Sequence, residues 1–106
     1  MPKYLFEARY TAEGVKGIAR DGGTGRRDAV AKACVSAGGK LEAMYFAFGD
    51  VDAYVIVDMP DNATAAALAL AVNQGGTATT NTVVLMTAEE VDAARKKTIT
   101  YSPPKG

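Results

Sequence analysis

The chain has 106 residues, of which 48% are hydrophobic and 23% charged, a balance typical of one folded domain. Twelve basic residues offset twelve acidic ones, so no net field favours nucleic acid or a membrane surface as a partner. The absence of histidine and the single cysteine, Cys34, exclude an intramolecular disulfide, a cysteine zinc cluster and nucleophiles activated by histidine. We expect one domain over residues 1–106, with no metal and no cofactor.

The N-terminal segment carries Glu7 and Arg9 and lacks the apolar core of a signal peptide. The longest apolar run, residues 65–72, is much shorter than the roughly 20 residues that cross a bilayer. We therefore expect a cytoplasmic protein without a membrane partner.

The first elements expected along the chain are a strand and a long, broken helix. Apolar and polar residues alternate over residues 3–10, which predicts a strand with the even-numbered residues on its apolar face. Residues 11–37 follow the helical period, with Thr11 as N-cap, a break at Gly22-Gly23 and a stop at Gly38-Gly39.

Two further strands are predicted next, because residues 41–48 and 53–59 are rich in aromatic and β-branched side chains. Gly49-Asp50-Val51-Asp52 lies between them. Since glycine and aspartate tolerate positive φ, this segment predicts a tight hairpin connection.

The second half of the chain predicts a helix over residues 62–74 and a strand over residues 79–86. Thr87-Ala88-Glu89-Glu90 has the spacing of a capping box and begins a short helix to about residue 97. The tail, residues 98–106, is strand-like before its two prolines and could add a strand to a neighbouring sheet.

The predicted order is β-α-β-β-α-β, followed by a short helix and a tail. In so short a chain, right-handed crossovers favour an α+β, ferredoxin-like sandwich. This fold has a four-stranded antiparallel sheet in the order 4-1-3-2, with both long helices on one face. The other face then lacks helical cover.

The uncovered face is expected to mix apolar and polar side chains, as the lining of a cavity does. The third strand contributes Tyr54, Ile56 and Asp58, and the first strand contributes Leu5, Glu7 and Arg9. Two alternatives remain open for the side chains that the second strand places on this face. They are either Glu42 with Met44, Phe46 and Phe48, or Tyr45 with Leu41.

Six polar residues are candidates for a ligand site on this face, and they are Glu7, Arg9, Glu42, Tyr45, Tyr54 and Asp58. A carboxyl group whose pKa is raised by an apolar lining can act as a general acid or base, and a tyrosine hydroxyl can orient a carbonyl or phenol. Cross-strand ion pairs or interface hydrogen bonds explain the same residues without a ligand.

A weaker candidate is an anion site at Thr24, Arg26 and Arg27, where flexible backbone precedes a helical segment with two arginines. The alternative is a helix break with solvated arginines.

Residues 62–88 contain no Asp, Glu, Lys or Arg, although this stretch includes a helix and an edge strand. Natural edge strands usually carry charges or prolines that prevent unwanted pairing. We therefore expect a homodimer or higher homo-oligomer, with a two-fold dimer that buries the open sheet face as the simplest form. A solvated, alanine-rich helix is the alternative.

Several segments of the chain resemble the GYD domain family. They are Tyr4–Tyr10, Thr11-Ala12-Glu13-Gly14, Gly38-Gly39-Lys40-Leu41-Glu42, Tyr45, Gly49 and Val55-Ile56-Val57-Asp58-Met59-Pro60-Asp61. The resemblance covers nearly the whole chain and implies a ferredoxin-like fold, similar to dimeric α+β barrel proteins, with no established reaction. The hairpin departs from the family, because Gly49-Asp50-Val51-Asp52 lacks the tyrosine of the family's name, for which Tyr54 is a candidate substitute.

These observations predict a small homo-oligomeric binding or accessory protein, with a cavity between subunits for a small apolar or weakly acidic molecule. The alternative is a cofactor-independent enzyme, similar to a monooxygenase or isomerase, that uses a carboxylate and a tyrosine or arginine on the open sheet face. A third hypothesis is a structural or regulatory module whose uncharged surface docks another protein.

Overall fold

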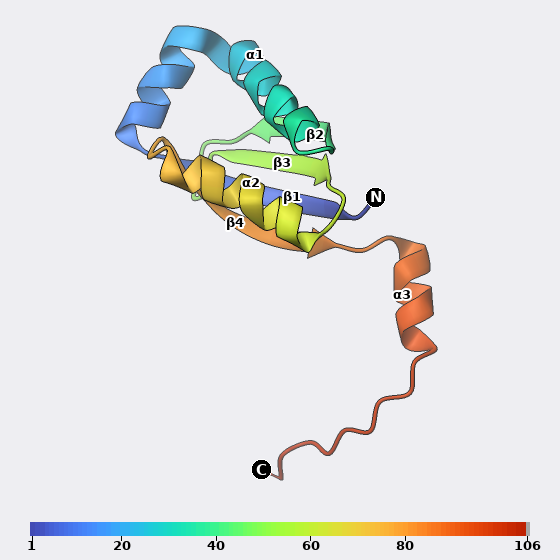
Figure 1. The fold of residues 1–106 in the computed structure, drawn as a ribbon. Helices are drawn as coiled ribbons and strands as arrows, with labels where there is room; N and C mark the ends of the chain where they lie inside the picture. The colour runs from blue at the N-terminus through green and yellow to red at the C-terminus, as the bar shows by residue number, and fades with distance from the viewer. Residues whose placement is uncertain (106) are drawn as a thin grey trace.

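The computed structural model describes residues 1–105, which form four strands and three helices (Figure 1). In chain order they are β1 (Lys3–Tyr10), α1 (Ala12–Ser36), β2 (Lys40–Phe46), β3 (Ala53–Asp58), α2 (Asn62–Gln74), β4 (Ala78–Leu85) and α3 (Ala88–Arg95). The predicted elements are all present, with ends that differ from the expected ones by a few residues.

The strands form one antiparallel sheet in the order β2-β3-β1-β4. α1 and α2 lie on the same face of this sheet, and nothing in residues 1–105 covers the other face (Figure 1). This arrangement confirms the predicted α+β, ferredoxin-like fold and its strand order.

The core lies between the sheet and the two helices. The even-numbered residues of β1, including Tyr4 and Phe6, are buried there together with Val57 of β3. α1 contributes Cys34 and α2 contributes Ala65, both of which are almost fully buried. Burial raises the pKa of the Cys34 thiol, which keeps it protonated and makes it a core side chain rather than a nucleophile.

α1 is broken at Gly22, as the sequence predicts. Gly22 has φ 76° and ψ 169°, a backbone conformation that interrupts the helix and that side chains with a Cβ rarely adopt. The residues before the break lead away from the sheet, and the residues after it return towards β2 (Figure 1). Thr11 caps the first part, because its Oγ1 accepts a hydrogen bond from the Gly14 N–H at 3.3 Å.

The predicted hairpin between β2 and β3 is present, and the Ala47 N–H donates to the Asp52 carbonyl oxygen at 2.8 Å, but the connection is longer than predicted and does not use positive φ. β2 ends at Phe46 and β3 begins at Ala53, so the connection spans residues 47–52, and Gly49 does not have positive φ. Two contacts stabilise the longer loop. Val51 is buried, and the Asp52 N–H donates to the carbonyl oxygen of Ala8 at 2.9 Å.

The C-terminal part extends away from the sheet. The predicted capping box is present, since the Glu90 N–H donates to Thr87 Oγ1 at 3.1 Å and the Thr87 N–H donates to Glu90 Oε1 at 3.0 Å. α3 and residues 96–105 are exposed throughout and lie apart from the sheet (Figure 1). Residues 98–105 pair with no strand of this chain, so the addition of a strand to a neighbouring sheet stays a prediction, and Gly106 lies outside the described residues.

The extended C-terminal arm, defined as residues 86–105, gives the chain an unusually large surface. The accessible area is 7334 Å², whereas a compact chain of 11.0 kDa exposes about 5,600 Å². The apolar side chains of the C-terminal arm include Met86, Val91, Ile99 and Tyr101, and each of them is more than half exposed. The helices within residues 1–105 are too short or too polar to span a bilayer.

Candidate functional site

The sheet register brings a carboxylate and two tyrosines into one row on the open face. Glu7 of β1 pairs with Tyr54 of β3, and Tyr54 pairs with Tyr45 of β2. Direct partners in an antiparallel sheet share a face, and their Cβ atoms lie about 4.5–5.5 Å apart. Because Tyr4 and Phe6 of β1 point into the core, this row points away from the helices.

A β-bulge decides between the two alternatives for the second strand. The pairing shifts between Leu41 and Ala43, so the strand alternation changes phase at Glu42. Leu41 and Met44 then pack against the core on the helix side, whereas Tyr45 lies on the open face. Neither alternative is correct as a whole, because the bulge places Glu42 and Tyr45 on the same face.

The two remaining acidic candidates are joined by a lysine that connects three strands. Lys3 Nζ lies 2.7 Å from Glu42 Oε1 and 2.8 Å from Asp58 Oδ1. The hydrogen bond to Asp58, then that to Glu42, raises the pKa of Lys3, and the Lys3 ammonium holds the pKa of Asp58 below its usual value. Glu42 and Asp58 thus each form a cross-strand ion pair with Lys3, which is the predicted type of contact without a ligand. Arg9 is exposed near the end of β1.

The low pKa of Asp58 makes stability depend on pH in a defined direction. The unfolded chain binds a proton at Asp58 at higher pH than the folded chain does, so this stabilisation is complete above the unfolded pKa of about 3.9 and disappears as the pH falls through the folded pKa. We expect the difference in melting temperature between wild type and Asp58→Asn to be largest near neutral pH and to vanish in strong acid. Asp50→Asn, in the exposed loop, is the control, and a difference for Asp58→Asn that does not change with pH would contradict the ion pair.

An apolar band separates this ionic cluster from the row of tyrosines. Consecutive register partners across the four strands form it, and they are Ala43, Ile56, Leu5 and Val83. Tyr45 and Tyr54 beside the band are 68% and 39% exposed, which is high for aromatic rings in a sheet. The open face therefore has an apolar centre with a carboxylate and two hydroxyl groups along one side.

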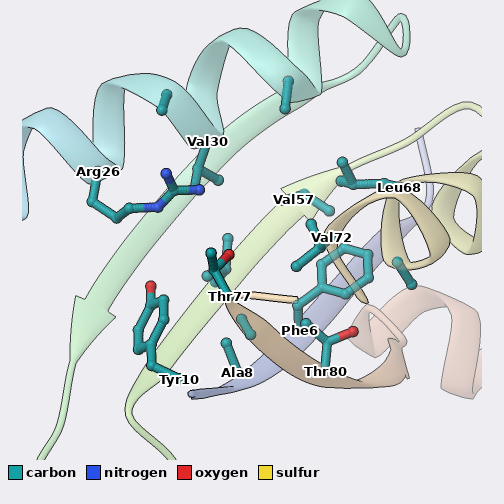
Figure 2. A pocket seen from close by; sticks show the side chains of 15 residues that line it. Phe6, Ala8, Tyr10, Arg26, Val30, Val57, Leu68, Val72, Thr77 and Thr80 are labelled. Carbon is teal, nitrogen blue, oxygen red and sulfur yellow. The ribbon is translucent and has the colours of Figure 1, made fainter. Parts of the chain in front are cut away.

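A second hollow, which the sequence patterns do not reveal, lies on the helix side of the sheet. It is a cavity of about 90 Å³ between α1, α2 and the strands below them (Figure 2). Phe6 and Val57 of the sheet and Leu68 and Val72 of α2 line its apolar part. The apolar periodicity of each helix predicts which side faces the sheet, but it does not predict how far apart the two helices lie.

Arg26 and Tyr10 form the polar end of this cavity (Figure 2). Burial raises the pKa of Tyr10, the positive charge of Arg26 opposes that shift, and the charge of Asp52 adds to it. Asp52 Oδ2 also accepts a hydrogen bond from the Tyr10 N–H at 2.9 Å. The weak anion candidates are thus separated by the structure, because Arg26 lines the cavity while Thr24 and Arg27 are exposed.

Within residues 1–105, no group of three or more Cys, Asp or Glu side chains is arranged to hold a metal ion. The open face carries carboxylate and phenol groups, and the helix-side cavity carries a guanidinium and a phenol.

A four-stranded antiparallel sheet with two long helices on one face and an open second face defines a ferredoxin-like α+β protein. The family model described as GYD domain matches residues 4–94, and the chain belongs to this family. No curated protein and no solved structure matches the chain.

Proposed function

We propose that the protein is a homodimeric or higher homo-oligomeric small-molecule binding protein, in which two open sheet faces enclose a cavity. The observation that carries this proposal is the row of Glu7, Tyr54 and Tyr45 beside an apolar band, on a face that residues 1–105 leave uncovered. The ligand that fits such a lining is small and apolar or weakly acidic, with a group that accepts or donates a hydrogen bond. The proposal places the protein in the cytoplasm, where its single free thiol stays reduced.

The area of the sheet face supports a dimer to which the C-terminal arm also contributes. Four strands at about 4.8 Å spacing and about eight residues long project roughly 500 Å². A stable interface buries about 800 Å² of accessible surface on each partner, and the accessible surface of a sheet face exceeds its projected area because the side chains add relief. The arm, residues 86–105, supplies additional exposed apolar area on the same chain, and the uncharged β4 edge lies next to it.

Native mass spectrometry of the protein purified from its own source tests both parts of the proposal. We expect a mass of at least twice the 11.0 kDa of one chain, together with a retained small molecule. The Glu7→Gln variant should lose that molecule and keep its oligomeric state, since Glu7 contributes a charge to the cavity and little apolar area. A monomer at micromolar concentration contradicts the dimer, and retention by Glu7→Gln removes Glu7 from the site.

The second candidate function is a cofactor-independent enzyme. It is favoured by the direct pairing of Glu7 with Tyr54, because neighbouring side chains on one face then carry a carboxylate that can accept a proton and a hydroxyl that can orient an oxygen atom. Incubating the retained molecule with fresh protein distinguishes the two functions. Recovery of the unchanged molecule supports binding alone, and a product whose formation Tyr54→Phe slows at least tenfold supports the enzyme.

A further inference from the structure

The cavity between α1 and α2 is apolar at one end and cationic at the other. Phe6, Val57, Leu68 and Val72 form a wall of hydrocarbon, on which no charged group faces the space (Figure 2). Its volume of about 90 Å³ is of the same order as the cavity of about 150 Å³ that accepts benzene in a well-studied engineered protein. A ring or a short branched chain is therefore the largest apolar body that the inner part can hold.

The cationic end is provided by Arg26, which is half-buried and makes no ion pair within residues 1–105. The two carboxylates whose charge acts on Tyr10 or Arg26, Asp52 and Asp21, accept hydrogen bonds from other groups. Asp21 accepts from Arg20 at 2.9 and 3.1 Å, and Asp52 accepts from the Tyr10 N–H at 2.9 Å. The charge of Arg26 contributes to the lowered pKa of Asp21 nearby, but the guanidinium forms no ion pair in the described part of the chain, and a guanidinium partly removed from water is a site that an anion stabilises.

Tyr10 supplies a second polar group at the same end. Its ring lines the cavity, and its hydroxyl points towards Arg26 (Figure 2). Because burial raises the pKa of Tyr10, the hydroxyl stays protonated at neutral pH and is available as a donor. A phenol oxygen can accept from a guanidinium and still donate its own proton.

We propose that this helix-side cavity binds a small carboxylate with an apolar body, of the size of benzoate, separately from the open sheet face. The carboxylate accepts hydrogen bonds from the Arg26 guanidinium and the Tyr10 hydroxyl, and the apolar body lies against Phe6 and Val72. The neutral, planar carboxamide of the same shape lacks the charge that Arg26 requires, so the cavity discriminates between the two.

The kink in α1 provides a path of entry to this site. A hollow of about 350 Å³ under the first part of α1 shares Tyr10, Arg26 and Thr77 with the cavity. The carboxylate end of the ligand therefore lies where the cavity meets the hollow, and substituents larger than the inner cavity can extend towards Gly17. On this side, the part of α1 before the break at Gly22 leads away from the sheet (Figure 1).

Benzoate and benzamide are the probes, and NMR titration of the backbone amides measures both affinity and location. We expect benzoate to bind wild type with shifts at Tyr10, Val30 and Val72, and benzamide to bind at least tenfold more weakly. The Arg26→Met variant should bind benzoate at least tenfold more weakly than wild type. Arg27→Met removes the same charge from an exposed neighbour on α1 and should change the affinity less than twofold.

The comparison of benzoate with benzamide on wild type tests the proposal even where Arg26→Met does not fold. Equal affinity for the two probes, absence of benzoate binding, or shifts confined to Tyr45 and Tyr54 on the open face would each overturn it. Equal weakening by Arg26→Met and Arg27→Met would also overturn it, because the effect would then follow from net charge alone. None of these results depends on the oligomeric state, so they leave the proposed dimer to its own test.

Discussion

Gly14→Ala is expected to lower the free energy of unfolding by about 3–5 kcal/mol, a large part of the stability of a domain of this size. A Cβ atom at Gly14 would lie 2.0 Å from the carbonyl oxygen of Thr77, far inside van der Waals contact. Relief requires α1 to move away from the segment before β4. That movement breaks the bond from the Thr11 N–H to the Thr77 oxygen at 3.0 Å and the bond from Thr11 Oγ1 to the Gly76 oxygen at 2.9 Å.

Gly17→Ala is the matched control on the same helix. The nearest atom to a Cβ at Gly17 is the end of the Arg20 side chain at 3.9 Å, and Gly17 does not have positive φ. Alanine should therefore stabilise the protein by about 0.5–1 kcal/mol through its helix propensity. Urea unfolding of both variants measures the contrast, and similar stabilities for the two would show that α1 does not approach Thr77 as closely as described.

The features that the sequence predicts correctly depend on residues close together in the chain. Thr11 and Thr87 cap helices because their hydroxyl groups reach backbone amides three residues on. The break in α1 depends on Gly22 alone, and the order of the strands follows from the sequence of elements together with the right-handed crossover rule.

The features that the sequence does not predict depend on contacts between distant segments. The bulge at Glu42 exists because β2 pairs with β3 on both sides of it, and a single-strand pattern does not contain that pairing. The role of Arg26 depends on the direction that α1 takes after Gly22 and on its distance from α2. The sequence periodicity does place Tyr10 on the helix face of the sheet. It therefore predicts one residue of the helix-side cavity but not the cavity itself.

Ile56→Arg is expected to dissociate the proposed dimer, raising its dissociation constant more than 100-fold. Ile56 lies on an inner strand in the apolar band, next to its register partner Leu5, and is half-buried within one chain. In a two-fold dimer that buries this face, each substitution brings two arginine side chains into the desolvated apolar band, at a cost of several kcal/mol. Glu42 and Asp58 are already paired with Lys3, and Glu7 on the adjacent row offsets only part of that cost. The isolated chain tolerates the change because the long side chain can extend into water when no second sheet covers it.

Two matched variants locate the interface, and analytical ultracentrifugation with a melting curve for each separates dissociation from unfolding. Val35→Arg introduces the same charge on the exposed side of α1, where Val35 is 70% exposed, and should leave the dimer intact. Leu70→Arg, equally exposed on the uncharged α2, should also leave it intact, because α2 covers the opposite face of the sheet. Dissociation by Leu70→Arg and not by Ile56→Arg would move the interface to the helix side, and the row of Glu7, Tyr54 and Tyr45 would then face solvent rather than a shared cavity.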